Sequence, residues 1–273
     1  MEGRNPNMKN SNPVLVIDFN NTVYRARAGY NRGDHSITYT FFLMLRKMVE
    51  KFSPSCVYIV KEGRPQRRHD AFGEYKANRS SPGDDFWRQH GDIVDILSTM
   101  PVRIVRHALR ECDDTIAHLV RVTHKDDECV IVSTDTDFIQ LLSDDDRIKL
   151  WSPGKEVWVK NFPVDYVKWK SLVGDGSDNI PGFKGIGAKT AEKMLLDPQK
   201  FQAFMQQEEG RQEKFERNLF LIAFHEIEDG LEETNVVPSW QATRSIFNDR
   251  GFFSITNDKS WLKYTNTFNS INQ

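Results

Sequence analysis

Short apolar runs alternate with longer amphipathic stretches along the first 160 residues of the chain. Four runs have the length and composition of buried strands: 14–17, 56–60, 102–105 and 129–132. Three stretches between them carry apolar residues at helical spacing: 37–52, 86–97 and 113–122. Two further runs, 148–151 and 156–159, flank S-P-G-K, which predicts a hairpin. Strands that alternate with helices in this way predict an α/β fold with a mainly parallel sheet flanked by helices.

Strand signals fade after residue 163. The pattern there predicts helices at 165–173, 188–196 and 215–224, the first two joined by a glycine-rich turn. Residues 244–268, rich in Phe, Asn and Thr, have no clear period, and neither has the basic segment 61–83, which ends in S-S-P-G. We therefore expect three parts, listed here by residue range: a polar tail at 1–13, an α/β core at 14–162 and a helical region at 163–273.

The composition of the chain favours a soluble globular protein over a membrane or secreted one. The hydrophobic fraction of 38% and the charged fraction of 28% are typical of a soluble globular protein that buries a core. No apolar run approaches the roughly 20 residues of a membrane span, and the polar N-terminus lacks a signal-peptide core. Cys56, Cys112 and Cys129 have no zinc or disulfide spacing. These features predict a cytoplasmic protein with free thiols and no membrane contact.

The charge distribution says more than the net charge of −2, which by itself does not indicate nucleic-acid binding. Residues 61–79 are mainly basic, whereas acids dominate from 111 to 146. A basic segment beside an acidic pocket fits a polyanion held over bound metal ions. On charge alone, an ordinary solvated surface is the better explanation of the same residues.

Eight carboxylates lie where predicted strands end or predicted helices begin: Asp18, Glu111, Asp113, Asp114, Asp135, Asp137, Asp175 and Asp178. Because the carboxyl ends of parallel strands line one edge of a sheet, we expect these acids to converge on one pocket. Carboxylates packed together repel each other unless cations hold them. Oxygen ligands without His or Cys suit Mg²⁺ or Mn²⁺, and such a cage is typical of phosphodiester hydrolysis. Helix capping is the alternative role for each acid taken singly, above all for Asp114.

Five segments, in this order along the chain, carry a resemblance to a known family: I-D-F-N-N-T-V-Y-R (17–25), R-R-H-D-A-F-G-E-Y-K-A-N-R (67–79), E-C-D-D (111–114), S-T-D-T-D-F (133–138) and G-D-G-S-D-N-I-P-G-F-K-G-I-G-A-K-T-A (174–191). The chain resembles the structure-specific 5′-nucleases over residues 14–225. These include flap endonucleases, the 5′-nuclease domain of bacterial DNA polymerase I and phage ribonuclease H. The stretch R-I-K-L-W-S-P-G-K-E-V-W-V is most similar to the T-even phage ribonuclease H branch.

The resemblance implies a PIN-like nuclease core, a basic helical arch around 61–100 and a helix–turn–helix that binds duplex DNA within 163–273. It implies that six of the acids form a site for two Mg²⁺ or Mn²⁺ ions and that Asp175 and Asp178 complete the second ion's shell. One ion would activate water and the other would steady the leaving oxygen.

The resemblance also assigns basic and aromatic residues. Lys76 and Arg79 match a catalytic pair that holds the scissile phosphate, although Lys and Arg in a polar segment usually face solvent. Tyr75 would stack on a base, or else belong to the core. Arg25 and Arg68 would lie near the 5′ end of the nucleic acid, or else form salt bridges with the acids.

The glycine-rich turn would grip the duplex backbone. The positions concerned are Gly182, Gly185, Gly187, Lys189 and Thr190. Glycines let the backbone approach a phosphate, and a helix N-terminus favours an anion. The family often holds a monovalent cation such as K⁺ on the carbonyls of this turn.

One position departs from the family pattern. Counting back from Arg79, the family's acid at the end of the second strand falls on Lys61, with Glu62 next to it. A shift of one residue in a strand turns a side chain to the other face. A lysine ammonium in the site would repel a metal ion, or would instead pair with surplus carboxylates.

These observations predict a metal-dependent 5′-nuclease that cleaves branched or 5′-ended DNA, with RNA–DNA hybrid as a further substrate. We expect a monomer that acts in primer removal during replication, alongside replication proteins and in a phage setting. Two alternatives remain open. One is a flap-binding protein whose catalysis is impaired by Lys61, and the other is a small PIN-type ribonuclease.

Overall fold

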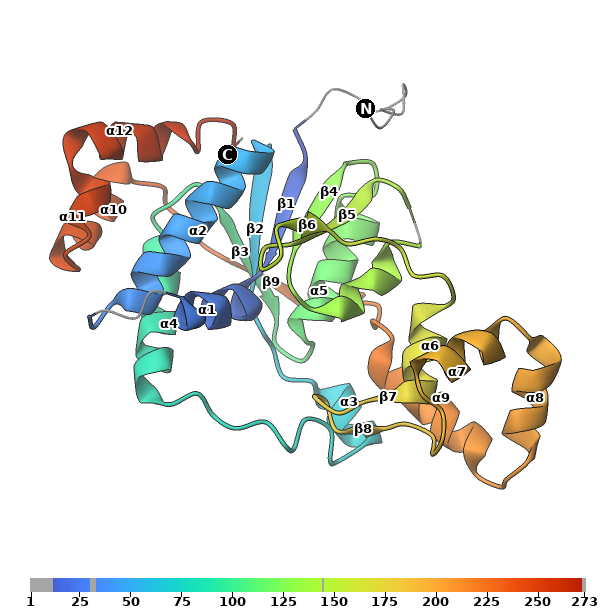
Figure 1. The fold of residues 1–273 in the computed structure, drawn as a ribbon. Helices are drawn as coiled ribbons and strands as arrows, with labels where there is room; N and C mark the ends of the chain where they lie inside the picture. Colours follow the sequence, from blue (N-terminus) through green and yellow to red (C-terminus); the bar gives the residue numbers. More distant parts are fainter. Residues whose placement is uncertain (1–11, 30–32, 144, 272–273) are drawn as a thin grey trace.

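A sheet of seven strands forms the centre of the protein, in the order β6-β5-β4-β1-β2-β3-β9 (Figure 1). The computed structural model describes residues 12–29, 33–143 and 145–271. The strand bounds are β1 Val14–Asp18, β2 Cys56–Val60, β3 Arg103–His107, β4 Cys129–Val132, β5 Ile148–Ser152, β6 Val157–Trp158 and β9 Leu231–Thr234. The five inner strands are parallel, and β6 and β9 run antiparallel at the two edges. The carboxyl ends of β1, β2, β3 and β4 therefore meet at one edge of the sheet.

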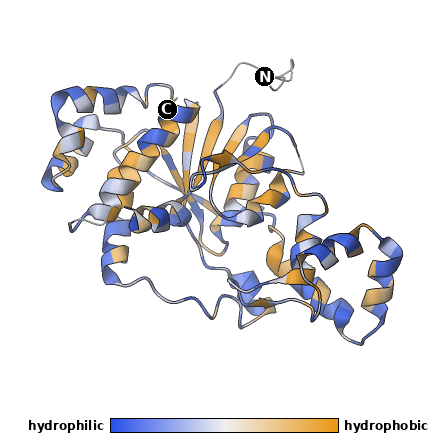
Figure 2. Ribbon diagram, viewed as in Figure 1, coloured by the Kyte–Doolittle hydropathy of each residue, from blue (hydrophilic) through white to orange (hydrophobic). Residues whose placement is uncertain are grey.

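Helices cover both faces of this sheet. One face carries α1 (Phe19–Ala28), α2 (Ser36–Phe52) and α4 (Asp84–Leu97), and the other carries α5 (Cys112–His118), η1 (Leu119–Thr123) and η2 (Thr136–Leu141). Alternate strand residues enter the two cores, since Ile17 belongs to one and Val16 to the other. Figure 2 shows the apolar residues concentrated in these strands. Burial on both faces explains why the inner strands read as continuous apolar runs.

A smaller helical lobe lies beside the carboxyl edge of the sheet (Figure 1). It contains α6 (Tyr166–Val173), α7 (Ala188–Leu195), α8 (Pro198–Gln206) and α9 (Arg211–Ile222), and the short strands β7 (Gly174–Asp175) and β8 (Ile180–Pro181) pair between α6 and α7. The lobe has a core of its own, which includes Leu172, Phe183 and Phe215. The short helix α3 (Gln66–Ala71) packs against α9 and joins this lobe to the sheet.

The last part of the chain returns to the α/β core. Strand β9 pairs with β3, and α10 (Trp240–Asp249), α11 (Phe253–Thr256) and α12 (Asp258–Asn266) follow. Phe247 and Tyr264 are fully buried, and the ring centroids of Phe247 and Phe42 lie 5.1 Å apart. The stretch 163–273 is therefore divided between the helical lobe and a cover for α2, and does not form one helical region.

The predicted α/β class is confirmed, as are the predicted strands, the hairpin and the helices at 37–52, 86–97 and 165–173 within one or two residues. Helices α1, α3 and α8 and strand β9 were not predicted. Strand β9 reads L-E-E-T and is exposed along its whole length, so it lacks the apolar signal of an inner strand. The predicted tail at 1–13 lies outside the described residues except for positions 12 and 13. None of the helices in the described ranges is long and apolar enough to cross a membrane.

Candidate functional site

Three carboxylates form the centre of the candidate site at the carboxyl edge of the sheet. Asp18 ends β1, Asp135 follows β4, and Asp113 lies in the first turn of α5, beyond β3. Ser133 Oγ donates to Asp18 Oδ2 at 2.9 Å and accepts from the Asp135 amide at 3.0 Å, which ties two of the three acids together. Ligand atoms of Asp18, Asp113 and Cys112 lie within 4.8 Å of one another. These three groups, two carboxylates and one thiol, lie close enough together to coordinate a single ion.

These three acids have no ion-pair partner, although the charge of Lys76 acts on Asp113 from further away. No Lys or Arg of the described ranges forms an ion pair with Asp18, Asp113 or Asp135. Burial, with the nearby Asp135 charge adding to it, raises the pKa of Asp18 to about 6. The same two causes raise the pKa of Asp113 well above its usual range. A divalent cation would favour the charged forms that burial and repulsion disfavour, so the residues fit the metal ion that the sequence predicted.

A second group of acids is neutralised by a lysine that sequence analysis did not identify. Lys170, on α6 and nearly buried, forms ion pairs with both Asp137 and Asp175. Tyr166, one turn earlier on the same helix, donates to Asp137 Oδ1 at 3.2 Å. The spacing of Tyr166 and Lys170 on one helix face is a signal in the sequence, but it does not distinguish a site residue from a surface lysine.

The pKa values of these two acids differ because their surroundings differ. Burial raises the pKa of Asp137 to about 6, although Lys170 opposes the change. Burial also acts to raise the pKa of Asp175, but hydrogen bonds from Lys170 and Ser177 lower it to about 2. Asp175 is therefore held as a carboxylate, and a second cation near this pair would have to compete with the Lys170 ammonium.

A buried network holds two of the predicted metal ligands. Arg68 is 3% exposed and forms two parallel hydrogen bonds of 2.8 Å with Asp114. It also contacts Glu111 at 2.6 Å and donates to the backbone carbonyls of Leu221 and Ala223. Since Arg68 is enclosed, the structure favours the salt-bridge interpretation over a contact near the 5′ end. Asp114 is fully buried, with both oxygens in this network, so it supports the site rather than facing it.

Lys76 and Arg79, the basic pair in the segment 67–79, face the acids. Lys76 forms ion pairs with Glu111 and Asp178, and Arg79 forms one with Asp178. The Arg79 side chain is 54% exposed, so it can reach a phosphate in solution. Tyr75 is buried and donates to Glu111 at 3.0 Å, which favours a core role over base stacking.

Lys61 and Glu62 point to opposite faces of the sheet. Val60 belongs to the same core cluster as Val16, so strand alternation places Lys61 on the other face and Glu62 on the face of Asp18. Burial and the charge of Arg106 lower the pKa of Lys61, while Asp95 and Glu232 raise it, so its charged neighbours are on α4, β3 and β9. The expectation that Lys61 stands among the carboxylates is wrong.

Glu62 lies on the carboxylate side in its place. It accepts a hydrogen bond of 3.1 Å from the amide of Cys112. The residue as a whole is exposed, but its carboxyl group is surrounded by protein atoms. This desolvation, with the charges of Glu111 and Asp18, raises the pKa of Glu62 to about 7 against the opposing Lys76. Glu62 is therefore a candidate site residue. Counting along the sequence placed the family's acid one residue too early, on Lys61.

The glycine-rich turn presents an exposed surface beside this site. A Cβ on Gly182 would lie 2.0 Å from the carbonyl oxygen of Val173, so only glycine fits that position. Gly185 has a φ of +79°, and Gly187 precedes the first residue of α7. Lys189 and Thr190 are exposed in the first turn of α7.

Arg25 lies away from the acids. It lines a pocket of about 470 Å³ with Lys47, Lys51 and Trp151, beside the β5–β6 hairpin. Its guanidinium packs directly against Gly154. The same groove also contains the carboxylate of Glu156, and Arg25 forms no ion pair with the predicted metal ligands in the described ranges.

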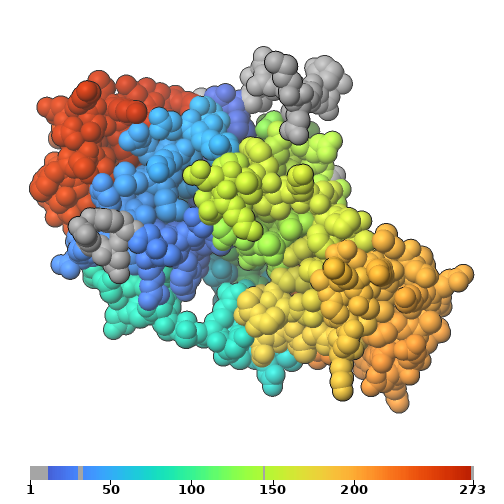
Figure 3. Space-filling view, viewed as in Figure 1, coloured from blue at the N-terminus to red at the C-terminus, as the bar shows by residue number. Residues whose placement is uncertain are grey.

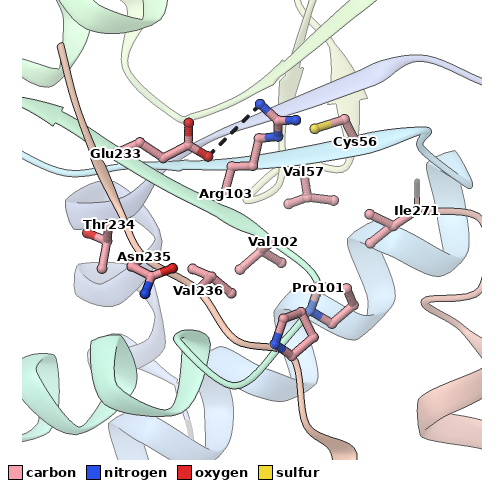
Figure 4. Close-up of a pocket in the computed structure, with 11 residues that line it drawn as sticks. Cys56, Val57, Pro101, Val102, Arg103, Glu233, Thr234, Asn235, Val236 and Ile271 are labelled. Carbon is pink, nitrogen blue, oxygen red and sulfur yellow. Dashed lines mark ion pairs between the residues drawn. The ribbon is translucent and has the colours of Figure 1, made fainter. Parts of the chain in front are cut away.

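Two pockets can be compared as reaction sites. One of about 500 Å³ is lined by Asp135, Asp137, Lys170, Asp175 and Asp178. Another of about 620 Å³ lies at the amino ends of β2 and β3, and Figure 4 shows mainly apolar side chains there with a single Arg103–Glu233 ion pair. The first pocket is the better candidate for a reaction site, because its lining contains four carboxylates and Lys170 at the carboxyl edge of the sheet.

A family model for the 5′-3′ exonuclease N-terminal resolvase-like domain matches residues 13–170, well over half of the chain. The chain belongs to this 5′-3′ exonuclease family. Among curated relatives, thermostable DNA polymerase I of Thermus aquaticus is 33% identical over 213 residues, 71% of this chain and 25% of that protein. DNA polymerase I of Streptococcus pneumoniae is 30% identical over 207 residues, 67% of this chain and 24% of that protein. The chain thus spans about a quarter of the length of the curated relatives it matches.

Solved structures share the fold over nearly the whole chain. The T5 D15 protein co-crystallised with metal ions has a TM-score of 0.64 at 17% identity, covering 93% of this chain and 97% of that one. Flap endonuclease-1 from Methanococcus jannaschii has a TM-score of 0.64 at 13% identity, covering 94% and 93%. The catalytic core of Rad2 in complex with a DNA substrate has a TM-score of 0.59 at 14% identity, covering 96% and 93%. The predicted family and nuclease fold are confirmed, and the T-even branch stays a prediction.

Proposed function

We propose that this protein is a divalent-metal-dependent 5′-nuclease that hydrolyses phosphodiesters in branched or 5′-ended DNA. The observation that carries the proposal is the group of Asp18, Asp113 and Asp135, three neighbouring acids that form no ion pair within the described ranges, at the carboxyl edge of a 5′-3′ exonuclease fold. Such a group of buried acids gains stability from a hard cation, and helix capping by Asp18 and Asp135 does not account for their convergence with Asp113.

Bound Mg²⁺ or Mn²⁺ would supply an activated water and neutralise charge on the reacting phosphate. Asp18, Asp113, Asp135 and Glu62 would hold one ion. Asp137, Asp175 and Asp178 would hold another in competition with Lys170. Lys76 and Arg79 would orient the scissile phosphate and stabilise the charge that develops on it. Glu111 would position Lys76 through their ion pair.

The shape of the molecule supports one route for the nucleic acid. Figure 3 shows an opening bounded on one side by the segment 72–83, which runs from α3 to α4 and carries Lys76 and Arg79. A single strand with a free 5′ end would pass there, while Lys189 and Thr190 contact the duplex backbone. RNA–DNA hybrid as a substrate, replication proteins as partners, a monomeric state and a phage setting remain parts of this proposal.

Cleavage assays test the proposal directly. A labelled 5′-flap, a nicked duplex and an RNA–DNA hybrid are incubated with Mg²⁺, Mn²⁺, Ca²⁺ or chelator. We expect cleavage with Mg²⁺ or Mn²⁺ only, because a small hard cation is needed to activate water. Undiminished cleavage in chelator would contradict the metal-dependent mechanism.

Lys76→Ala and Lys189→Ala are expected to act on different steps. Lys76→Ala should lower the single-turnover cleavage rate about a hundredfold, since it removes a cation from the reacting phosphate. Lys189→Ala should weaken duplex binding and reduce the salt slope of binding by about one counterion. Single-turnover rates and salt-dependent binding distinguish the two. Equal losses of affinity with unchanged rates would mean that both residues only hold the backbone.

Glu62→Gln and Lys61→Met test which residue of the second strand belongs to the site. Glu62→Gln should raise the Mg²⁺ concentration needed for half-maximal cleavage, because it removes a carboxylate beside Asp18 and Glu111. Lys61→Met should leave that concentration unchanged, because its charged neighbours are Arg106, Asp95 and Glu232. The measurement is cleavage rate against Mg²⁺ concentration. The opposite pattern would restore Lys61 to the site and revive the alternative of a flap-binding protein with impaired catalysis.

A further inference from the structure

Helix α9 donates hydrogen bonds to two consecutive carbonyls of the glycine-rich turn. Lys214 Nζ donates to the carbonyl oxygen of Gly182 at 2.6 Å. Asn218 Nδ2 donates to the carbonyl oxygen of Pro181 at 3.0 Å and to that of Ser171 at 3.0 Å. Lys214 and Asn218 are one helical turn apart and so extend from the same face of α9. The turn is thus anchored from outside by two side chains of a single helix.

The Lys214 ammonium is held in place on a second side. It lies 4.7 Å from the centroid of the Phe183 ring, a distance at which a cation is attracted to the ring face. Phe183 follows Gly182 directly and belongs to the core of the lobe. The ammonium therefore contacts two successive residues of the turn, through a carbonyl oxygen and through an aromatic ring.

A monovalent cation on the same carbonyls would meet two obstacles. K⁺ needs several carbonyl oxygens to replace its hydration shell, but the oxygens of Pro181 and Gly182 already accept hydrogen bonds. An ion bound to the Gly182 oxygen would share that acceptor with the Lys214 ammonium, and two positive charges on one oxygen repel each other. These two carbonyls, with Lys214 and Asn218 on them, are therefore poor ligands for the K⁺ that the family resemblance predicted at this turn.

We propose that the Lys214 ammonium is the resident cation of the glycine-rich turn and takes the place of a bound monovalent ion. A tethered ammonium is present at every ionic composition, so the turn keeps its shape without K⁺. If the turn grips duplex DNA, as the proposed function holds, that grip does not require K⁺ beyond its general screening effect.

Melting temperatures in KCl and in choline chloride of equal ionic strength test this proposal. Choline is too large to sit on a turn carbonyl. The variants are Lys214→Met, which keeps the side chain's length without its charge, and Lys214→Gln, which keeps a neutral donor. Lys200→Met, on the exposed surface of α8, removes the same charge elsewhere and serves as the control.

We expect wild type and Lys200→Met to melt at the same temperature in both salts. Lys214→Met should melt roughly 5 °C lower in choline, the loss expected for one charged hydrogen bond in a protein of this size, and should recover in KCl. Lys214→Gln should lie between wild type and Lys214→Met. Duplex binding measured in the same two salts should follow the same order.

Three results would overturn the proposal. One is a saturable stabilisation of the wild type by K⁺ over choline, which would mean that the turn binds the ion. Another is a Lys214→Met protein that melts like Lys200→Met in both salts. The third is a loss in Lys214→Met that KCl does not restore. Because melting is measured without nucleic acid, these outcomes are independent of whether the protein cleaves DNA.

Discussion

Asp135→Asn is expected to lower the rate of flap cleavage by roughly a thousandfold, the effect of several kcal/mol of lost transition-state stabilisation. Burial is the main cause of the raised pKa values of Asp18 and Asp113, and the charge of Asp135 is the strongest repulsion that adds to it. Asp135 is therefore the acid whose charge most increases the need for a cation. Asparagine keeps the size of the side chain but removes its charge. Metal affinity should fall and the rate with it, while flap binding through Lys189 and Thr190 should persist.

The measurements are single-turnover cleavage, flap binding in Ca²⁺ and cleavage across a Mg²⁺ series. Asp126→Asn, which changes an exposed acid, is the matched control. A rate close to that of the control would show that Asp135 only caps the short helix η2, where its side chain accepts a hydrogen bond from the Asp137 amide at 2.8 Å.

The sheet could be predicted because burial on both faces makes its inner strands apolar along their whole length. The pattern failed at β9, whose four residues are exposed, and at α1, which begins with F-N-N-T and has little apolar period. It also failed for the last 40 residues, where Phe247 and Tyr264 are buried only because α10 and α12 return to α2. Local sequence carries no signal of such a distant partner.

The site could be predicted as a set of acids but not as a set of charge pairs. Parallel topology brings Asp18, Asp113 and Asp135 together, and that follows from strand order alone. That Lys170 neutralises Asp137 and Asp175 depends on how the helical lobe docks against the sheet. Glu62 was assigned to the wrong face because a count along the chain between two motifs is uncertain by one residue, and one residue reverses the face of a strand.

Arg68→Met is expected to destabilise the protein by roughly 3 to 5 kcal/mol, because it leaves the buried carboxylate of Asp114 without its cation and removes one of the two cations paired with Glu111. For a chain of this size the melting temperature should fall by about 10 °C. The loss should exceed that of any exposed arginine, since Arg68 also joins α3 to the carbonyls of Leu221 and Ala223. Thermal and urea denaturation measure it.

Arg67→Met is the matched control, because Arg67 precedes Arg68 in α3 and is exposed. Arg68→Lys should recover only part of the stability, since an ammonium cannot form the two parallel hydrogen bonds to Asp114. A stable Arg68→Met protein that binds flaps weakly would contradict this argument. It would favour the other role predicted for Arg68, a contact near the 5′ end of the nucleic acid, and would require the arginine to leave its buried position when the substrate binds.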